Sequence, residues 1–141
     1  MPPVAPVGAS VTWRPATKSL DNSSLAGEAL AAGDFVYKKV SDSRWWKALA
    51  TIDMSDTAVV RSVGVAMGPS DSAGDPASVA NEPGTIIDLG TAIAKNTFLV
   101  PSGAGGIEEY ADLTVGEYLN YWGVGNGADL IFNPLLTGIT K

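Results

Sequence analysis

The chain contains no cysteine and no histidine, and it has few charged residues for its length of 141 residues. The lack of cysteine excludes a disulfide framework, a thiolate nucleophile and a cysteine-based metal site. The lack of histidine removes the most common general base and metal ligand. Charged residues make up only 17% of the sequence, which indicates that part of the surface is covered in an assembly. Folding must therefore rest on packing or on partners.

Basic residues are especially scarce in the second half of the chain. Through Arg61 there are seven basic and six acidic residues, whereas beyond it there are two basic and nine acidic residues. The net charge is −6, and no basic cluster is present. Because binding a phosphate backbone requires clustered lysine and arginine, we expect no nucleic-acid partner. The second half should instead present an acidic face.

The sequence also lacks a long apolar run. It begins with MPPVAPVGAS, which has no basic region and no apolar stretch of the length that a signal peptide requires. We therefore expect neither a secretory signal nor a membrane partner. The protein is expected to be made and to act inside a cell, or in a particle assembled there.

Short apolar runs make up most of the chain, and turn-forming residues separate them. Examples are DFVYKKV, AVVRSVGVAM and GEYLNYWGV. About seven or eight such runs predict an all-β single domain, either a small barrel or a sandwich, and a jelly-roll topology fits the same pattern. We assign residues 28–134 to this β domain, residues 1–27 to an extended N-terminal arm, and residues 135–141 to a C-terminal tail or edge strand.

The N-terminal arm has no helical or alternating pattern, and it holds four of the nine prolines. Such a segment is either disordered or docks on a neighbouring surface through apolar anchors. The anchors available are Val11, Trp13 and Leu20. We favour docking in the assembled state only. The one candidate helix, SLAGEALAAG, ends at a glycine, and a single turn before the first strand explains it equally well.

Two consecutive tryptophans lie in the run RWWKALATI, and on a strand their side chains point to opposite faces. Trp46 shares its face with a uniformly apolar set, Ala48, Ala50 and Ile52. This alternation predicts that Trp46 faces the core. Trp45 then either lies under a loop of its own chain or forms a contact with a partner together with Arg44.

In the run AVVRSVGVAM, an arginine interrupts an apolar face. The residues on that face are Val59, Arg61, Val63, Val65 and Met67. Burying an unpaired charge is costly, so we expect Arg61 to sit near a sheet edge or to pair with an acidic residue.

Glycine-rich motifs raise the possibility of chemistry, but none has the required context. The loop in FLVPSGAGGIEEY has no lysine to meet phosphate, so we interpret it as a hairpin loop whose IEEY returns as the next strand. GVGNGA has a dinucleotide-like spacing but is followed by a strand, DLIFNP, which indicates a hairpin turn.

Carboxylates are the remaining catalytic option. Glu108 and Glu109 are neighbours on a predicted strand, so they point to opposite faces and cannot converge on one sugar, and Asp112 and Glu117 add no calcium-loop spacing. An enzyme that acts on polysaccharide through Glu109 or Asp112 is thus a remote alternative. We expect no catalytic residue, no cofactor and no metal, and therefore no enzyme.

The order of the motifs AGDFVYKK, AVVRSVGVAMGPSDSAGDP, GTIIDLG, TFLVPSGAGGI and GEYLNYWGVG resembles that of a group of small bacteriophage structural proteins. The resemblance covers residues 30–134 and consists mostly of glycines at matching positions between the apolar runs. Members of this group are capsid decoration (cement) proteins or modules of head and tail fibres. The resemblance carries no catalytic residues to transfer to this chain.

This resemblance implies a capsid decoration protein that binds the outer surface of the assembled head and bridges major capsid protein subunits. It would act on the virion surface after assembly in the bacterial cytoplasm, as a homo-oligomer for which a trimer is favoured over a dimer. The predicted contact residues are Val11, Trp13, Arg14, Arg44, Trp45 and Tyr110. The alternative is a head-fibre or tail-fibre module that contacts the host surface.

Overall fold

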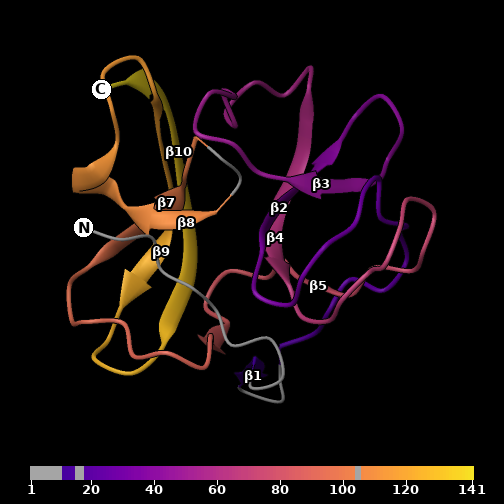
Figure 1. Cartoon of the computed structure of the whole chain (residues 1–141), viewed down its shortest axis with the longest axis horizontal. Coiled ribbons are helices and arrows are strands. Elements are labelled where there is room, and N and C mark those ends of the chain that lie inside the picture. The colour runs from indigo at the N-terminus through magenta and orange to yellow at the C-terminus, as the bar shows by residue number, and fades with distance from the viewer. Residues whose placement is uncertain (1–10, 15–17, 104–105) are drawn as a thin grey trace.

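The protein is a two-layer all-β sandwich in the computed structural model, which describes residues 11–14, 18–103 and 106–141 (Figure 1). One layer is a six-stranded antiparallel sheet, and the other is a four-stranded antiparallel sheet. Neither sheet closes into a barrel, so of the two predicted architectures the sandwich is the one observed.

The six-stranded sheet has the strand order β1-β6-β10-β9-β7-β8. Its strands are β1 (Thr12–Arg14), β6 (Ile86–Asp88), β7 (Phe98–Pro101), β8 (Ile107–Glu109), β9 (Tyr118–Gly125) and β10 (Leu130–Thr140). The four-stranded sheet has the order β3-β2-β4-β5. Its strands are β2 (Phe35–Lys39), β3 (Trp45–Lys47), β4 (Val60–Ala66) and β5 (Val79–Ala80).

One short 3-10 turn, η2 (Tyr110–Asp112), follows β8, and the described residues contain no α-helix. The candidate helix SLAGEALAAG instead forms isolated bridges that end in a turn at Gly33, where φ is 92°. Glycine adopts this left-handed conformation without steric cost. The alternative of a turn before the first long strand was therefore the correct one.

The main core lies between the two sheets, and one tryptophan joins them. Trp122 of β9 is fully buried and stacks on Phe35 of β2, with ring centres 5.4 Å apart and planes 9° from parallel. Its indole N–H donates a hydrogen bond of 2.7 Å to the carbonyl oxygen of Gly64 in β4. A single side chain of the six-stranded sheet thus contacts two strands of the other sheet.

A β-bulge at Arg61 changes which side of β4 faces the core. Lys38 pairs with Ser62 and Lys39 with Val60, so Arg61 is the extra residue. The bulge brings Val60 into the core together with Val63, although three positions separate them. The expectation that Val59 shares a face with Val63 and Val65 is therefore wrong, because it assumed an uninterrupted alternation.

Arg61 is exposed at a local edge of the four-stranded sheet. At this end β4 pairs only with β2, because β5 pairs with β4 at Val65 and Ala66 alone. The expectation that Arg61 sits near an edge is confirmed.

Residues 11–14 and 18–27 belong to the sandwich, so the predicted boundary of the arm at residue 27 is wrong for them. β1 pairs with β6, and Val11 and Leu20 pack against the main core. Beyond β1 the chain crosses to the four-stranded sheet, where Asp21 forms a bridge with Val79 and Ala26 with Trp45. Residues 1–10 and 15–17 of the predicted arm lie outside the described part.

Of the two alternatives for the C-terminal segment, a tail or an edge strand, the structure shows the strand, because beyond Ile131 β10 pairs only with β9. β10 runs from Leu130 to Thr140 and pairs with β9 along its length. The predicted boundary at Pro134 failed because the register between the two strands shifts between Phe132 and Leu135, and β6 pairs with β10 only at Leu130 and Ile131. Proline is tolerated at such a bulge, where its missing N–H breaks no ladder hydrogen bond.

The Asp21 carboxylate holds the N-terminal segment to the four-stranded sheet. It accepts a hydrogen bond of 2.9 Å from the Lys38 ammonium and further hydrogen bonds from the N–H and hydroxyl groups of Ser23. Partial burial alone would raise the pKa of Asp21, but the hydrogen bonds from Ser23 and Lys38 outweigh burial and lower the pKa from 3.8 to about 2.

Asp21→Asn is expected to destabilise the protein at neutral pH and to flatten its response to acid. Because the pKa of Asp21 is lower in the folded state than in the unfolded state, the ionised carboxylate stabilises the fold above pH 3.8, and this contribution is lost as the pH falls through about 2. Urea denaturation at a series of pH values should give a steeper loss of stability for the parent chain than for the variant. Asp71→Asn, at an exposed loop position, is the control and should follow the parent chain. Equal pH dependence of the parent chain and Asp21→Asn would contradict the prediction.

Candidate protein interface

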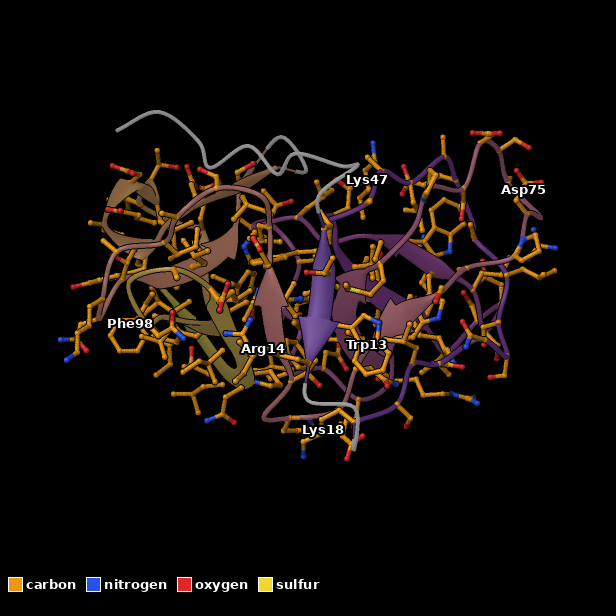
Figure 2. The ribbon with its side chains drawn as sticks, turned by 90° about the horizontal axis from the view of Figure 1, so that it is seen from below. Trp13, Arg14, Lys18, Lys47, Asp75 and Phe98 are labelled. Carbon is orange, nitrogen blue, oxygen red and sulfur yellow. The ribbon has the colours of Figure 1, made fainter. Side chains whose placement is uncertain are left out.

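An open groove on the outer face of the six-stranded sheet is the main candidate site. Its volume is about 440 Å³. Its lining residues come from β7, η2, β9 and β10, and they are Phe98, Tyr110, Tyr121, Gly123, Val124, Asn133 and Leu135. We call it the aromatic groove. Figure 2 shows Phe98 at one end of the molecule and Asp75 at the other.

Strand alternation places these side chains outward. Leu99 of β7 and Phe132 of β10 point into the main core, so their neighbours Phe98 and Asn133 point away from it. In β9, Trp122 faces the core, which leaves Tyr121 on the outer face. Val124 of the same strand pairs with Phe98 and so shares its outer face.

The exposed rings of the groove contact one another. The ring centre of Phe98 lies 6.2 Å from that of Tyr110 and 5.7 Å from that of Tyr121. The ring centres of the two tyrosines are 6.0 Å apart. Phe98 and Tyr110 are each 44% exposed, and Leu135 is 62% exposed. The solvent-facing side of an antiparallel sheet is usually polar, so an aromatic and aliphatic patch of this kind is typical of a surface that a partner covers.

The side of the groove toward β8 carries carboxylates. Glu108 of β8 pairs with Val100 of β7 on the outer face of the sheet. The pKa of Glu108 in β8 is raised, first by burial and then by repulsion from Glu117 and Asp112. A partner that brings positive charge to this side of the groove would therefore relieve repulsion.

A second recess lies at β1, the opposite edge strand of the same sheet from β8. Its volume is about 630 Å³. It is lined by Val11, Thr12, Trp13, Arg14, Leu20, Met67, Gly68 and Ser78. We call it the β1 recess. Figure 2 shows Trp13 and Arg14 on opposite sides of β1, and Arg14 forms an ion pair with Asp129 in the turn before β10.

Four of the six predicted contact residues line one of these two surfaces. Val11, Trp13 and Arg14 line the β1 recess, and Tyr110 lines the aromatic groove. The two surfaces are separate, so the structure does not bring Tyr110 together with the N-terminal residues. Arg44 lines neither surface.

Trp45 is the predicted contact that the structure contradicts. It is 0% exposed and packs in a second core cluster on the outer side of the four-stranded sheet, under Ala26 and Leu30 of its own chain. The alternative that a loop of its own chain covers Trp45 was therefore correct. Trp46 packs against the main core as predicted, although it is only partly buried, and its indole N–H donates to Asp42.

Phe98, Tyr121 and Leu135 are the groove residues that sequence reasoning missed. Phe98 begins a short apolar run, FLV, in which nothing distinguishes the outward position from the inward one. Tyr121 precedes Trp122, and their alternation could have shown that one of the two rings faces outward. Leu135 was missed because Pro134 was taken as the end of the sheet.

The two glycine-rich motifs lie where the sequence predicted them. β7 and β8 form the hairpin that FLVPSGAGGIEEY predicted, with residues 104–105 outside the described part. GVGNGA leads into the turn between β9 and β10. Among the described residues, no three acidic side chains gather closely enough to hold a metal ion.

Comparison of the chain with protein-family models, curated proteins and solved structures finds no match. Within the described part of the chain, no helix has the length and apolar character that crossing a membrane requires.

Proposed function

We propose that this chain is a bacteriophage capsid decoration protein that binds the outer surface of the assembled head and bridges major capsid protein subunits. The observation that supports this most is the presence of two separate apolar surfaces toward opposite edges of one sheet, the aromatic groove and the β1 recess. A protein with two such surfaces on one rigid domain can contact two neighbours at the same time. Holding neighbouring parts of a shell together requires at least two contact surfaces on one molecule.

Shell binding is proposed for the β1 side. β1 is the edge strand of its sheet, and such a strand offers free backbone groups to an added strand. Trp13 and Val11 place apolar surface beside this edge. A ligand that binds only the assembled shell stabilises it in proportion to its binding free energy, and many identical contacts add up across the lattice.

Binding of the purified protein to undecorated heads tests the proposal. We expect it to co-sediment with mature heads and to raise the temperature at which they release DNA. Trp13→Ala should weaken co-sedimentation at least tenfold, whereas Val115→Ala, at an exposed turn position, should bind as the parent chain does.

Antibody labelling of phage particles distinguishes the alternative. Label spread over the head agrees with decoration. Label confined to the tail or to single vertices would favour a fibre module, and a lack of binding to heads together with unlabelled particles would contradict both structural functions.

A further inference from the structure

The aromatic groove needs an apolar partner with positive charge beside it. The groove itself exposes Phe98, Tyr110 and Leu135, and Glu108 lies on the same outer face of the sheet, repelled by Glu117 and Asp112. Two grooves placed face to face would bring like charges together, which is unfavourable. The complementary surface must therefore be apolar at its centre and basic at its rim.

The chain carries such a surface on its other sheet. Val40 and Val59 are 37% and 43% exposed, and the N–H of Val40 donates a hydrogen bond of 2.9 Å to the carbonyl oxygen of Val59. We call these two residues the valine knob. Lys39 precedes Val40 in the chain, and Arg61 is exposed at the bulge two residues after Val59.

The basic residues beside the knob are opposite in charge to Glu108 beside the groove. They are Lys39 and the exposed Arg61, whereas Lys38 is nearly buried and pairs with Asp21. The bulge at Arg61 matters here, because it turns Val60 into the core and leaves Val59 and Arg61 outside. A small aliphatic pair with a neighbouring guanidinium fits an aromatic groove, since arginine and lysine are attracted to aromatic faces and to carboxylates.

Groove and knob belong to different layers of the sandwich, so one copy presents both (Figure 1). We propose that the aromatic groove of one copy binds the valine knob of a second copy. The contact is heterologous, because each copy uses one surface toward one neighbour and the other surface toward the next. Such a contact produces a closed ring when the rotation between copies closes, and a filament when it does not.

This inference does not rest on the proposed function, because assembly is measured with the protein alone. Light scattering coupled to size exclusion should give a mass above that of one chain for the parent protein. Val59→Asp in the knob and Leu135→Asp in the groove should each reduce the mass to that of a monomer. Val115→Asp places the same charge at another exposed apolar position and should leave the mass unchanged.

Mixing the two defective variants provides the sharpest test. Val59→Asp keeps an intact groove, and Leu135→Asp keeps an intact knob, so an equimolar mixture should form one good contact and give a heterodimer. Heterodimer formation also shows that both variants are folded. If Val59→Asp alone assembles like the parent chain, the groove pairs with something other than the knob and the inference is wrong.

Two other results would also overturn it. One is a parent chain that is monomeric at every concentration tested. The other is a mixture that stays monomeric while circular dichroism shows that both variants are folded. In the expected case, raising the salt concentration should weaken assembly, because exposed charges at the rim are screened. Shell binding without ring formation would refute this inference alone, and ring formation without shell binding would refute the proposed function alone.

Discussion

Replacing Trp122 by alanine is expected to lower the free energy of unfolding by about 3–5 kcal/mol, the usual cost of truncating a large buried aromatic side chain. Trp122 is fully buried, stacks on Phe35 and donates a hydrogen bond to Gly64 of the opposite sheet. The substitution therefore removes packing from the six-stranded sheet and a hydrogen bond from the four-stranded sheet. Urea denaturation followed by circular dichroism measures the change.

Trp122→Phe separates these two contributions. It retains an aromatic ring for stacking on Phe35 but leaves the carbonyl oxygen of Gly64 without its donor, so we expect a smaller loss of about 1–3 kcal/mol. Tyr110→Ala is the control, because Tyr110 is exposed and its removal should cost less than about 1 kcal/mol. A loss at Trp122→Ala no larger than that at Tyr110→Ala would show that the two sheets do not depend on this contact.

The all-β class could be predicted because it rests on a signal repeated along the whole chain. Each apolar run in the middle of the sequence is short and bounded by turn residues, which leaves little room for helices. The two hairpins, β7–β8 and β9–β10, were predictable for the same reason, since glycine marks both turns. These features depend on local chemistry, and local chemistry is what a sequence pattern reports.

The errors at both chain ends arose where tertiary contacts override local signals. Prolines made the N-terminal residues look like a free arm, yet β1 pairs with β6, which lies far from it in the sequence. Pro134 looked like a boundary, yet β10 passes through it because the register shift there places the proline where no neighbour requires its N–H. The local sequence of β1 does not show its partner β6, and the residues around Pro134 do not show the register shift.

The candidate interface was predicted only in part for a related reason. Tyr110 was among the predicted contact residues, but the groove requires residues from three strands and η2. Trp45 was misassigned because alternation shows only that its side chain points away from Trp46. It does not show that residues 26 and 30 cover that face. Residue type thus indicates an interface, while exposure depends on which distant segment folds over it.

Deletion of residues 1–24 is the second change expected to have a large effect. It removes β1, the packing of Val11 and Leu20 against the core, and the bridge between Asp21 and Val79. It also leaves the Asp129 carboxylate, which is only 7% exposed, without the guanidinium of Arg14. Because the deletion removes a whole strand, its apolar packing and the partner of Asp129 together, we expect a loss of at least about 3 kcal/mol, measured by thermal and urea denaturation of the free protein.

A substitution at Asp129 tests the reason for this loss. In the full-length chain, Asp129→Asn removes one partner of the ion pair and should destabilise the fold. In the truncated chain, the same substitution removes a carboxylate that has lost its partner and should restore part of the lost stability, so its effect changes sign. The sequence alone predicted an arm that docks only on a neighbour, and on that basis the deletion would leave the melting temperature of the free protein unchanged. An unchanged melting temperature of the truncated chain would show that β1 does not contribute to the stability of the fold. If Asp129→Asn changes stability in the same direction in both chains, the contribution of β1 does not act through Arg14 and Asp129.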